Sequence, residues 1–336
     1  MKRETANPTD TMDFVIFWVD DSDPAWQAAF RQARPAETDD ASLIRVRNWD
    51  NLRYWFRGVE RFAPWVRKIH FVTWGHLPAW LDTSHPKLHV VRHEEFIPAP
   101  YLPTFNSIVI GINLHRIEGL CPRFVVFNDD MFLTRDCRPE DFFRRGLPCD
   151  MARLSIVQPS SIGHIIYNCL EKLNARYDKR RAIAAHPGKW FSPRYGASNL
   201  LKTLTLMPWS TFPGLSDHHL PQPCLTAQYE RCWREWGGEL DRTCRHRFRN
   251  LTCLSDYLFR YDMLVSGEFV PRSMRDGRLM TLADDTLEAI CDDIRRQRWR
   301  TVCLNDSERI SDFPAASQRL REAFHTLLPD PCSYER

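Results

Sequence analysis

Residues 123–130 of this 336-residue chain read RFVVFNDD, a short apolar run that leads directly into two aspartates. A bounded run of aromatic and β-branched residues predicts a strand that is buried on both faces. Residues 14–23 repeat the pattern, with FVIFWV followed by DDSD. Two further strand candidates and two segments of helical spacing lie between these runs, at residues 68–73, 88–91, 49–62 and 107–117. This alternation predicts an α/β fold with a mostly parallel sheet.

The two acidic clusters follow predicted strands, and ligands of parallel sheets bind beyond the carboxyl ends of the strands. Asp129 and Asp130 come directly after a full buried strand. Carboxylate oxygens are the ligands that Mg²⁺ and Mn²⁺ prefer, so we favour a metal site there. The other cluster has a second interpretation, a solvated turn in which Asp23 caps a helix beginning at Pro24. For that cluster the spacing alone favours the turn.

Composition excludes several classes of protein. The chain has 46 basic and 43 acidic side chains, a net charge of +3, which argues against a general nucleic-acid binder. No apolar run is long enough for a membrane helix, and the first residues lack the apolar core of a signal peptide. The 11 cysteines form no CxxC pair, which favours reduced thiols in the cytoplasm over a zinc or disulfide framework.

Several motifs further along the chain are weak when each is taken alone. His219 could act as a base or acid near neutral pH, but a His in a loop is more often structural. Arg249, in the sequence HRFR, could neutralise phosphate charge, although the chain is rich in Arg throughout. Asn106 and Ser107 begin a predicted helix, whose free N–H groups suit a phosphate or need only an ordinary cap.

Read in order, these segments resemble the Stealth family of sugar-phosphate transferases. The resemblance runs from about residue 12 to 335 and is specific because several long blocks occur in the family's order. The later HHLP, HRFR and CLND segments also fall in that order. The leading blocks are DFVIFWVDDSDPAW (13–26), LRYWFRGVERFAPWVRKIHFVT (52–73), LPTFNS (102–107), LHRIEGL (114–120) and FVVFNDDMFL (124–133).

The resemblance implies transfer of sugar-1-phosphate from a UDP-sugar, such as UDP-N-acetylglucosamine or a UDP-hexose, to a hydroxyl of a polysaccharide or oligosaccharide acceptor. UMP would be released and a phosphodiester formed. The implied fold is a Rossmann-like sheet similar to the GT-A-type folds that bind nucleotide sugars. We expect a flexible N-terminus (1–12), a nucleotide-sugar-binding core (13–157), a helical acceptor-side cap (158–245) and a C-terminal part that folds back to complete the site (246–336).

The resemblance also implies roles for individual residues. The residues implied in catalysis are His219 for proton transfer, Arg249 for the diphosphate, and Asp129, which either serves as the base or helps to place the donor. The implied ligands of Mg²⁺ or Mn²⁺ are Asp129, Asp130 and Asp306. The implied substrate-binding residues are Trp18, Asp20, Asp23, Arg53, Asn106, Ser107 and Asn305.

Three positions depart from the family pattern. Asp21 stands where a Gly is common, Trp74 replaces the Asp of a TDG motif, and Gly111 stands where the family often carries Glu. These departures concern the identity of the sugar more than the type of reaction. Two alternatives remain open: a metal-dependent glycosyltransferase that releases UDP, and a non-catalytic assembly protein.

The last predicted helix, residues 315–328, has only a modest apolar stripe. We therefore expect it to dock on the core, and the alternative is that it lies on the inner membrane. Both interpretations fit a cytoplasmic enzyme that associates peripherally with the membrane.

Overall fold

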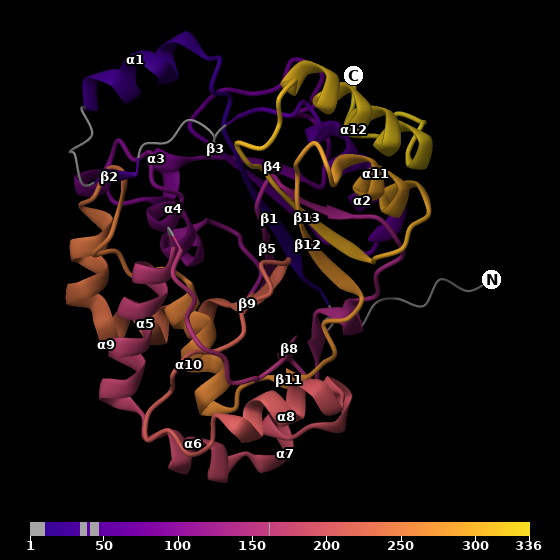
Figure 1. The fold of residues 1–336 in the computed structure, drawn as a ribbon. Coiled ribbons are helices and arrows are strands. Elements are labelled where there is room, and N and C mark those ends of the chain that lie inside the picture. The colour runs from indigo at the N-terminus through magenta and orange to yellow at the C-terminus, as the bar shows by residue number, and fades with distance from the viewer. Residues whose placement is uncertain (1–10, 34–38, 41–46, 161) are drawn as a thin grey trace.

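The computed structural model describes residues 11–33, 39–40, 47–160 and 162–336, and most of the N-terminus expected to be flexible lies outside these ranges. Its centre is a five-stranded sheet of order β4-β3-β1-β5-β9 (Figure 1). The four parallel strands are β1 (Asp13–Trp18), β3 (Ile69–Thr73), β4 (Leu88–Arg92) and β5 (Arg123–Phe127). Strand β9 (Gln222–Leu225) pairs antiparallel with β5. The predicted α/β fold with a mostly parallel sheet is confirmed.

Strand β1 separates two hydrophobic cores, because successive side chains of a strand point to opposite faces. Phe14 and Ile16 belong to one core, and Val15 belongs to the other. Burial on both faces is why the sequence of this strand is a continuous apolar run.

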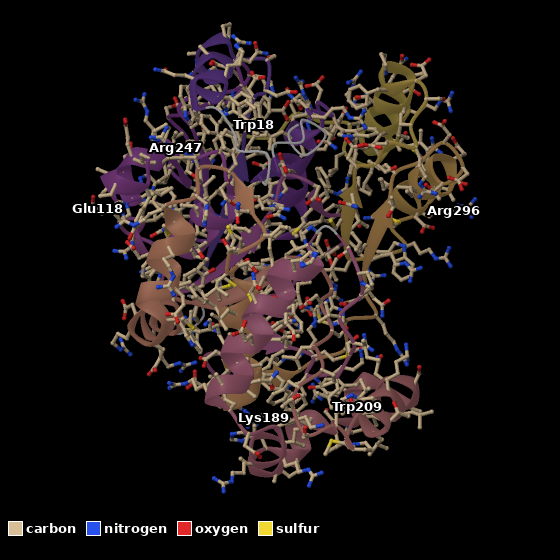
Figure 2. The ribbon with its side chains drawn as sticks, turned by 60° about the vertical axis from the view of Figure 1, so that its left-hand side comes forward. Trp18, Glu118, Lys189, Trp209, Arg247 and Arg296 are labelled. Carbon is tan, nitrogen blue, oxygen red and sulfur yellow. The ribbon has the colours of Figure 1, made fainter. Side chains whose placement is uncertain are left out.

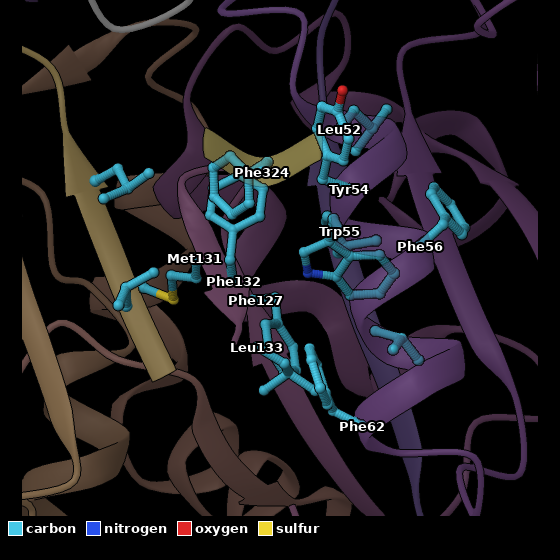
Figure 3. Close-up of a cluster of buried hydrophobic side chains, with 14 of the residues drawn as sticks. Leu52, Tyr54, Trp55, Phe56, Phe62, Phe127, Met131, Phe132, Leu133 and Phe324 are labelled. Atoms are coloured by element: carbon cyan, nitrogen blue, oxygen red, sulfur yellow. The ribbon is translucent and has the colours of Figure 1, made fainter. Parts of the chain in front are cut away.

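The first core lies between the sheet and three helices, α2 (Leu52–Phe62), α11 (Leu287–Arg295) and α12 (Phe313–Leu327). Aromatic rings fill it (Figure 3): the Trp55 and Phe127 centroids are 5.4 Å apart, and those of Phe132 and Phe324 are 4.7 Å apart. Phe324 of α12 is fully buried. The last helix therefore docks on the core. The structure does not support the alternative in which this helix lies on a membrane.

A second sheet, β12-β13-β6, joins the C-terminal part of the chain to the central sheet. The sequence did not predict its strands, which are β6 (Met131–Leu133), β12 (Gly277–Thr281) and β13 (Thr301–Asn305). Strand β13 pairs antiparallel with β6, and the Leu304 N–H donates to the Asp130 carbonyl at 2.8 Å. This pairing brings residues 301–305 beside the carboxyl end of β5.

Helices of the second core cover the other face of the central sheet (Figure 1). The helix expected over 107–117 ends at Asn113 and continues as a 3-10 turn, Leu114–Arg116. Helix α9 is kinked at Trp236, which has non-helical backbone angles. The four helices of this layer are α4 (Ser107–Asn113), α5 (Gly163–Arg176), α9 (Thr226–Cys244) and α10 (Tyr257–Ser266).

Three helices form a separate group at the lower end of the molecule in Figure 1: α6 (Lys179–Ala185), α7 (Pro187–Trp190) and α8 (Ala197–Thr205). No described helix has both the length and the apolar character that crossing a membrane requires. The remaining short elements are α1 (Pro24–Ala33), β2 (Asp39–Asp40), α3 (His93–Phe96), β7 (Phe143–Arg144), β8 (Leu147–Asp150), β10 (Arg249–Asn250), β11 (Val270–Pro271), and the 3-10 turns Ala99–Tyr101, Pro139–Asp141 and Pro193–Tyr195.

The amino end of the central sheet is closed by a buried ionic network around Asp13, whose side chain is inaccessible to solvent. One carboxylate oxygen accepts from Arg67 Nε at 2.8 Å. The other contacts His70 Nε2 at 2.9 Å and accepts from the Cys121 N–H at 2.8 Å. Burial alone would raise the pKa of Asp13, but the hydrogen bonds from His70 and Arg67 outweigh it and hold the pKa below 3.8.

Candidate active site

A cleft opens at the carboxyl ends of β1 and β5. Phe17 and Asn128 line the cleft at the strand ends, and Ser107 lines it at the start of α4. The third wall comes from the turn before β9 and from the start of α10, including His219 and Asp256.

Three polar side chains meet beside the cleft where β5 ends. His219 Nε2 lies 3.8 Å from Asp130 Oδ2, and the Cys303 thiol donates to the same oxygen at 3.2 Å. The ligand atoms of these three residues all lie within 4.8 Å of one another. The other oxygen, Asp130 Oδ1, is buried and has no hydrogen-bond partner among the described residues. A buried carboxylate oxygen without a partner is costly unless a ligand or ion completes it.

Burial and the neighbouring charges shift the pKa values of the side chains at this strand end. Burial, and then the charge of Asp130, raise the pKa of Asp129 to about 7. For His219, burial lowers the pKa, but the contact with Asp130 outweighs it and the net pKa is raised above 6.5. The fully buried Cys303 thiol has its pKa raised well above the usual value by burial and by Asp130. Cys303 is therefore a hydrogen-bond donor here and not a thiolate.

The His219 backbone is strained, with a φ of 46° in the left-handed region. Such a conformation persists only where the surrounding structure enforces it. A buried arginine of α10 holds the residues that lead into this turn: Arg260 donates to the Ser216 carbonyl at 3.0 Å and to the Asp217 carboxylate at 2.9 Å. Arg260 is itself held by two hydrogen bonds to Asp150, at 2.7 and 2.9 Å. The turn that carries His219 is thus fixed to β8 and α10.

Arg249 lies at the opposite wall of the cleft, where its guanidinium donates to Ser107 Oγ at 3.1 Å. Asp256 lies in the same wall as His219, and both His219 and Arg249 act on its pKa through their charges. Burial is the larger effect, so the pKa of Asp256 is raised. Asp256 stands at the N-cap of α10 but its side chain makes no capping hydrogen bond. One cleft therefore holds a histidine, an arginine and several carboxylates.

Relatives of this chain share nearly its whole length. The capsular polysaccharide phosphotransferase WcwK of Streptococcus pneumoniae is 34% identical over 97% of this chain and 98% of that protein. The exopolysaccharide phosphotransferase cps2G of Lactiplantibacillus plantarum is 33% identical over 99% and 98%. Models of conserved regions 2 and 4 of the Stealth proteins match residues 45–149 and 292–336.

The chain belongs to the Stealth family. Two solved structures share part of its arrangement at low similarity. The galactosyltransferase LgtC has a TM-score of 0.39 and 12% identity, with coverage of 95% of this chain and 98% of that one. Mouse xyloside xylosyltransferase 1 has a TM-score of 0.36 and 11% identity, with coverage of 87% and 97%.

Some residues implied by the Stealth resemblance lie in this cleft, and others lie elsewhere. His219, Arg249 and Ser107 line the cleft, and Asp130 adjoins it through His219. Asp129 precedes Asp130 at the same strand end and raises the pKa of Cys303 through its charge.

Asp306 and Asn305 are not among the residues that line the cleft. The Asp306 carboxylate accepts from Arg47 Nε at 2.7 Å and from Trp49 Nε1 at 2.9 Å, and it is outside the Asp130 group. Asn305 is exposed, and its carbonyl accepts from the Leu282 N–H.

The first Stealth block forms a turn above the sheet. Trp18 is buried and stacks on Phe71 at 5.8 Å, and the Asp20 carboxylate accepts from Ser22. Asp23 Oδ1 accepts from the Trp26 N–H at 2.7 Å, so Asp23 caps α1 as the turn interpretation predicted.

Arg53 and Asn106 make structural contacts. Arg53 lies over the Trp80 ring and 3.9 Å from Glu335, away from the residues that line the cleft. Asn106 is buried and caps α4 by accepting from the Ile108 N–H, while its amide donates to the Phe248 carbonyl at 3.1 Å. Asn106 thus ties the helix to the segment that carries Arg249.

Three residues in the buried part of this cleft were not identified from the sequence. Asp150, Arg260 and His218 line the cleft, and burial, then Arg260, lower the pKa of His218 to about 4. One signal was available: Arg260 and Asp262 interrupt an otherwise apolar helix, and buried charges inside a helix need partners. Asp256 carried no such signal, because an Asp at a helix start is expected as a cap.

Gly111 lines the cleft on α4, and a Cβ built there would meet no atom within 4 Å. Neither a positive φ nor close packing therefore requires glycine at this position. The absence of a side chain leaves room in the cleft at the place where the Stealth pattern often has Glu.

Proposed function

We propose that the chain transfers sugar-1-phosphate from a UDP-sugar, UDP-N-acetylglucosamine or a UDP-hexose, to a hydroxyl of a capsular or cell-surface polysaccharide acceptor. The observation that carries the proposal is the arrangement of His219, Arg249 and Asp130 around one cleft. The names of the full-length relatives support the same class of reaction and the class of acceptor.

In the proposed step the acceptor oxygen attacks the phosphorus that bears the sugar. The new bond joins the acceptor oxygen to that phosphorus, and the bond to the oxygen bridging to UMP breaks. UMP leaves with the electron pair, and the acceptor proton passes to the enzyme. The step needs an in-line hydroxyl, a base, and positive charge at the phosphoryl oxygens.

His219 would be the base. It lines the cleft, and although burial lowers its pKa, Asp130 raises it more, so the net pKa lies above the ordinary value of 6.5 and the ring can take up a proton. Asp130 would also stabilise the imidazolium that forms when a ring nitrogen of His219 takes the proton. Arg260, held by Asp150, is a positioning residue because it fixes the turn that carries His219.

Arg249 would stabilise the negative charge of the transferring phosphoryl group. Its guanidinium already reaches Ser107 Oγ, on the first residue of α4, where the positive end of the helix dipole also favours an anion. Ser107 and Arg249 would then bind the phosphate together.

A divalent cation fits the acidic end of β5. Asp130 Oδ1 is buried and lacks a hydrogen-bond partner among the described residues, and an oxygen ligand of this kind suits Mg²⁺ or Mn²⁺. Asp130 would hold the cation with help from Asp129, whereas Asp306 is engaged by Arg47. When bound, the cation would neutralise charge on the donor diphosphate.

The test is to incubate the protein with a panel of UDP-sugars, an acceptor oligosaccharide, and Mg²⁺ or Mn²⁺, and then to identify the nucleotide released. UMP together with a phosphodiester product supports the proposal. UDP would instead make the protein a glycosyltransferase that breaks the bond at the sugar carbon. No turnover with any donor would favour a non-catalytic assembly protein.

A further inference from the structure

The segment from Lys179 to Ser216, which contains α6, α7 and α8, has an unusual charge distribution. It contains six Lys and Arg residues and no Asp or Glu, a charge of +6 in a chain whose total is +3. The rest of the chain is therefore net acidic. We call residues 179–209 the basic lobe, and it lies at the end of the molecule opposite Trp18 (Figure 2).

The basic lobe exposes large apolar side chains together with cations. Leu201 and Leu204 of α8 are 61% and 53% exposed, and Trp209, in the turn that follows, is 53% exposed. Leu201 and Leu204 are three residues apart, so they share one face of the helix. Thr203 is the single buried residue of α8 among its nine, so the helix turns most of its surface outward. Figure 2 shows Trp209 at the outer surface of this lobe.

The cations around this apolar face lack ion-pair partners among the residues that the structure describes. Arg180, Arg181, Arg194 and Lys202 are exposed, and none of them forms an ion pair with a described residue. By contrast, Lys179 and Lys189 bind backbone carbonyls and hold the lobe together. The exposed cations are therefore available to an anionic partner.

We propose that the basic lobe docks the protein on a membrane surface that contains anionic lipid. Exposed Leu and Trp side chains next to Lys and Arg are what an interfacial helix presents to the boundary between headgroups and acyl chains. Leucine side chains gain free energy when they enter an acyl layer, whereas an anionic polysaccharide would offer them only water and hydroxyl groups. This surface differs from the C-terminal helix, and the proposal does not depend on the proposed reaction.

The first experiment measures binding of the full chain to extruded vesicles by co-sedimentation, comparing equal mixtures of phosphatidylglycerol and phosphatidylcholine with phosphatidylcholine alone. We expect binding to the anionic vesicles only, and weaker binding as salt rises. Leu201→Ser/Leu204→Ser should weaken binding by at least about ten-fold. Arg180→Gln/Arg181→Gln should weaken it by about five-fold per charge.

The matched control is Leu77→Ser/Leu279→Ser, which removes two leucines that are 42% and 44% exposed elsewhere on the surface. This control should bind vesicles like the unaltered chain. Failure of the unaltered chain to bind anionic vesicles would overturn the proposal, as would equal losses in the lobe variant and the control.

A second measurement locates the contact directly. All 11 native cysteines are buried, so a cysteine introduced by Leu204→Cys can be labelled selectively with an environment-sensitive fluorophore. Anionic vesicles should shift its emission to the blue, while the same label at Leu279→Cys should not shift. A label at position 204 that responds to a protein from the same cell and not to vesicles would overturn the membrane proposal and indicate a protein partner.

Discussion

The two ends of the central sheet use the same residue types in different ways. At the amino end, Asp13 is buried and both of its oxygens accept hydrogen bonds from Arg67, His70 or Cys121. At the carboxyl end, Asp130 also faces a histidine, but one of its oxygens has no partner among the described residues. A satisfied network stabilises the fold, whereas an incomplete one is poised for a ligand.

The difference also appears in the protonation of the carboxylates. Hydrogen bonds hold the pKa of Asp13 below 3.8, while burial and a neighbouring carboxylate raise the pKa of Asp129 to about 7. At the amino end, the folded chain supplies hydrogen bonds that stabilise the charged form of Asp13. The carboxyl end keeps charges close together at a cost in stability, which is typical of functional sites.

The largest expected effect is at the carboxyl end. His219→Asn should lower the rate of UMP release about 10²–10⁴-fold because the base is lost. Asn tolerates the left-handed φ of 46° better than most residues, so the melting temperature should change little. His164→Asn, on an exposed position of α5, is the matched control and should keep full activity. Retention of activity in His219→Asn would exclude His219 as the base.

The amino end should respond in stability instead. Asp13→Asn should lower the free energy of unfolding by about 3–5 kcal/mol, because Arg67 and His70 lose their buried partner. Denaturant unfolding measures this effect, with the exposed Asp136→Asn as the control. Activity per folded molecule should be unchanged, and a selective loss of activity would break the contrast between the two ends.

This prediction has a pH dependence. The pKa of Asp13 is lower in the folded chain than in the unfolded chain, so its stabilising effect is complete above the ordinary value of 3.8. The effect should disappear as the pH falls through the lowered pKa. Asp13→Asn should therefore have a flatter loss of stability below about pH 4 than the unaltered chain.

The third effect distinguishes two arginines. Arg249→Ala should lower the rate of transfer by about 10²-fold, because a charge at the phosphoryl group is lost. Arg53→Ala should change the rate by less than about two-fold, because Arg53 contacts Trp80 and Glu335 and does not line the cleft. Equal losses in the two variants, measured as kcat/KM, would contradict the placement of the donor phosphate beside Arg249.

The smallest effect concerns Gly111. Gly111→Ala should stabilise α4 by about 0.5–1 kcal/mol, because Ala loses less backbone entropy in a helix. The new methyl group meets no atom within 4 Å, so no clash should offset the gain. Thermal unfolding measures the stability, and a panel of UDP-sugars shows whether the side chain narrows donor choice. A loss of stability would mean that the helix needs glycine for another reason.

Much of the fold could be predicted from local patterns. The buried strands β1 and β5 are continuous apolar runs, β3 alternates polar and apolar residues, and α2 has helical spacing. Strands β6 and β13 could not be predicted, because each is short and is stabilised by pairing with the other across more than 160 residues. Local propensity carries no information about such a partner.

Features of the site that depend on residues close together in the sequence could be predicted, whereas those that depend on residues far apart in the sequence could not. By itself, the sequence determined the parallel sheet, the acidic end of β5 and, through whole blocks of residues, membership of the Stealth family. Only the tertiary structure decided that Asp130 lies beside His219 and Cys303, that Asp306 is bound by Arg47, and that Arg260 fixes the His219 turn. The physical reason is that charge and hydrogen bonding act over a few ångströms in space, whatever the separation along the chain.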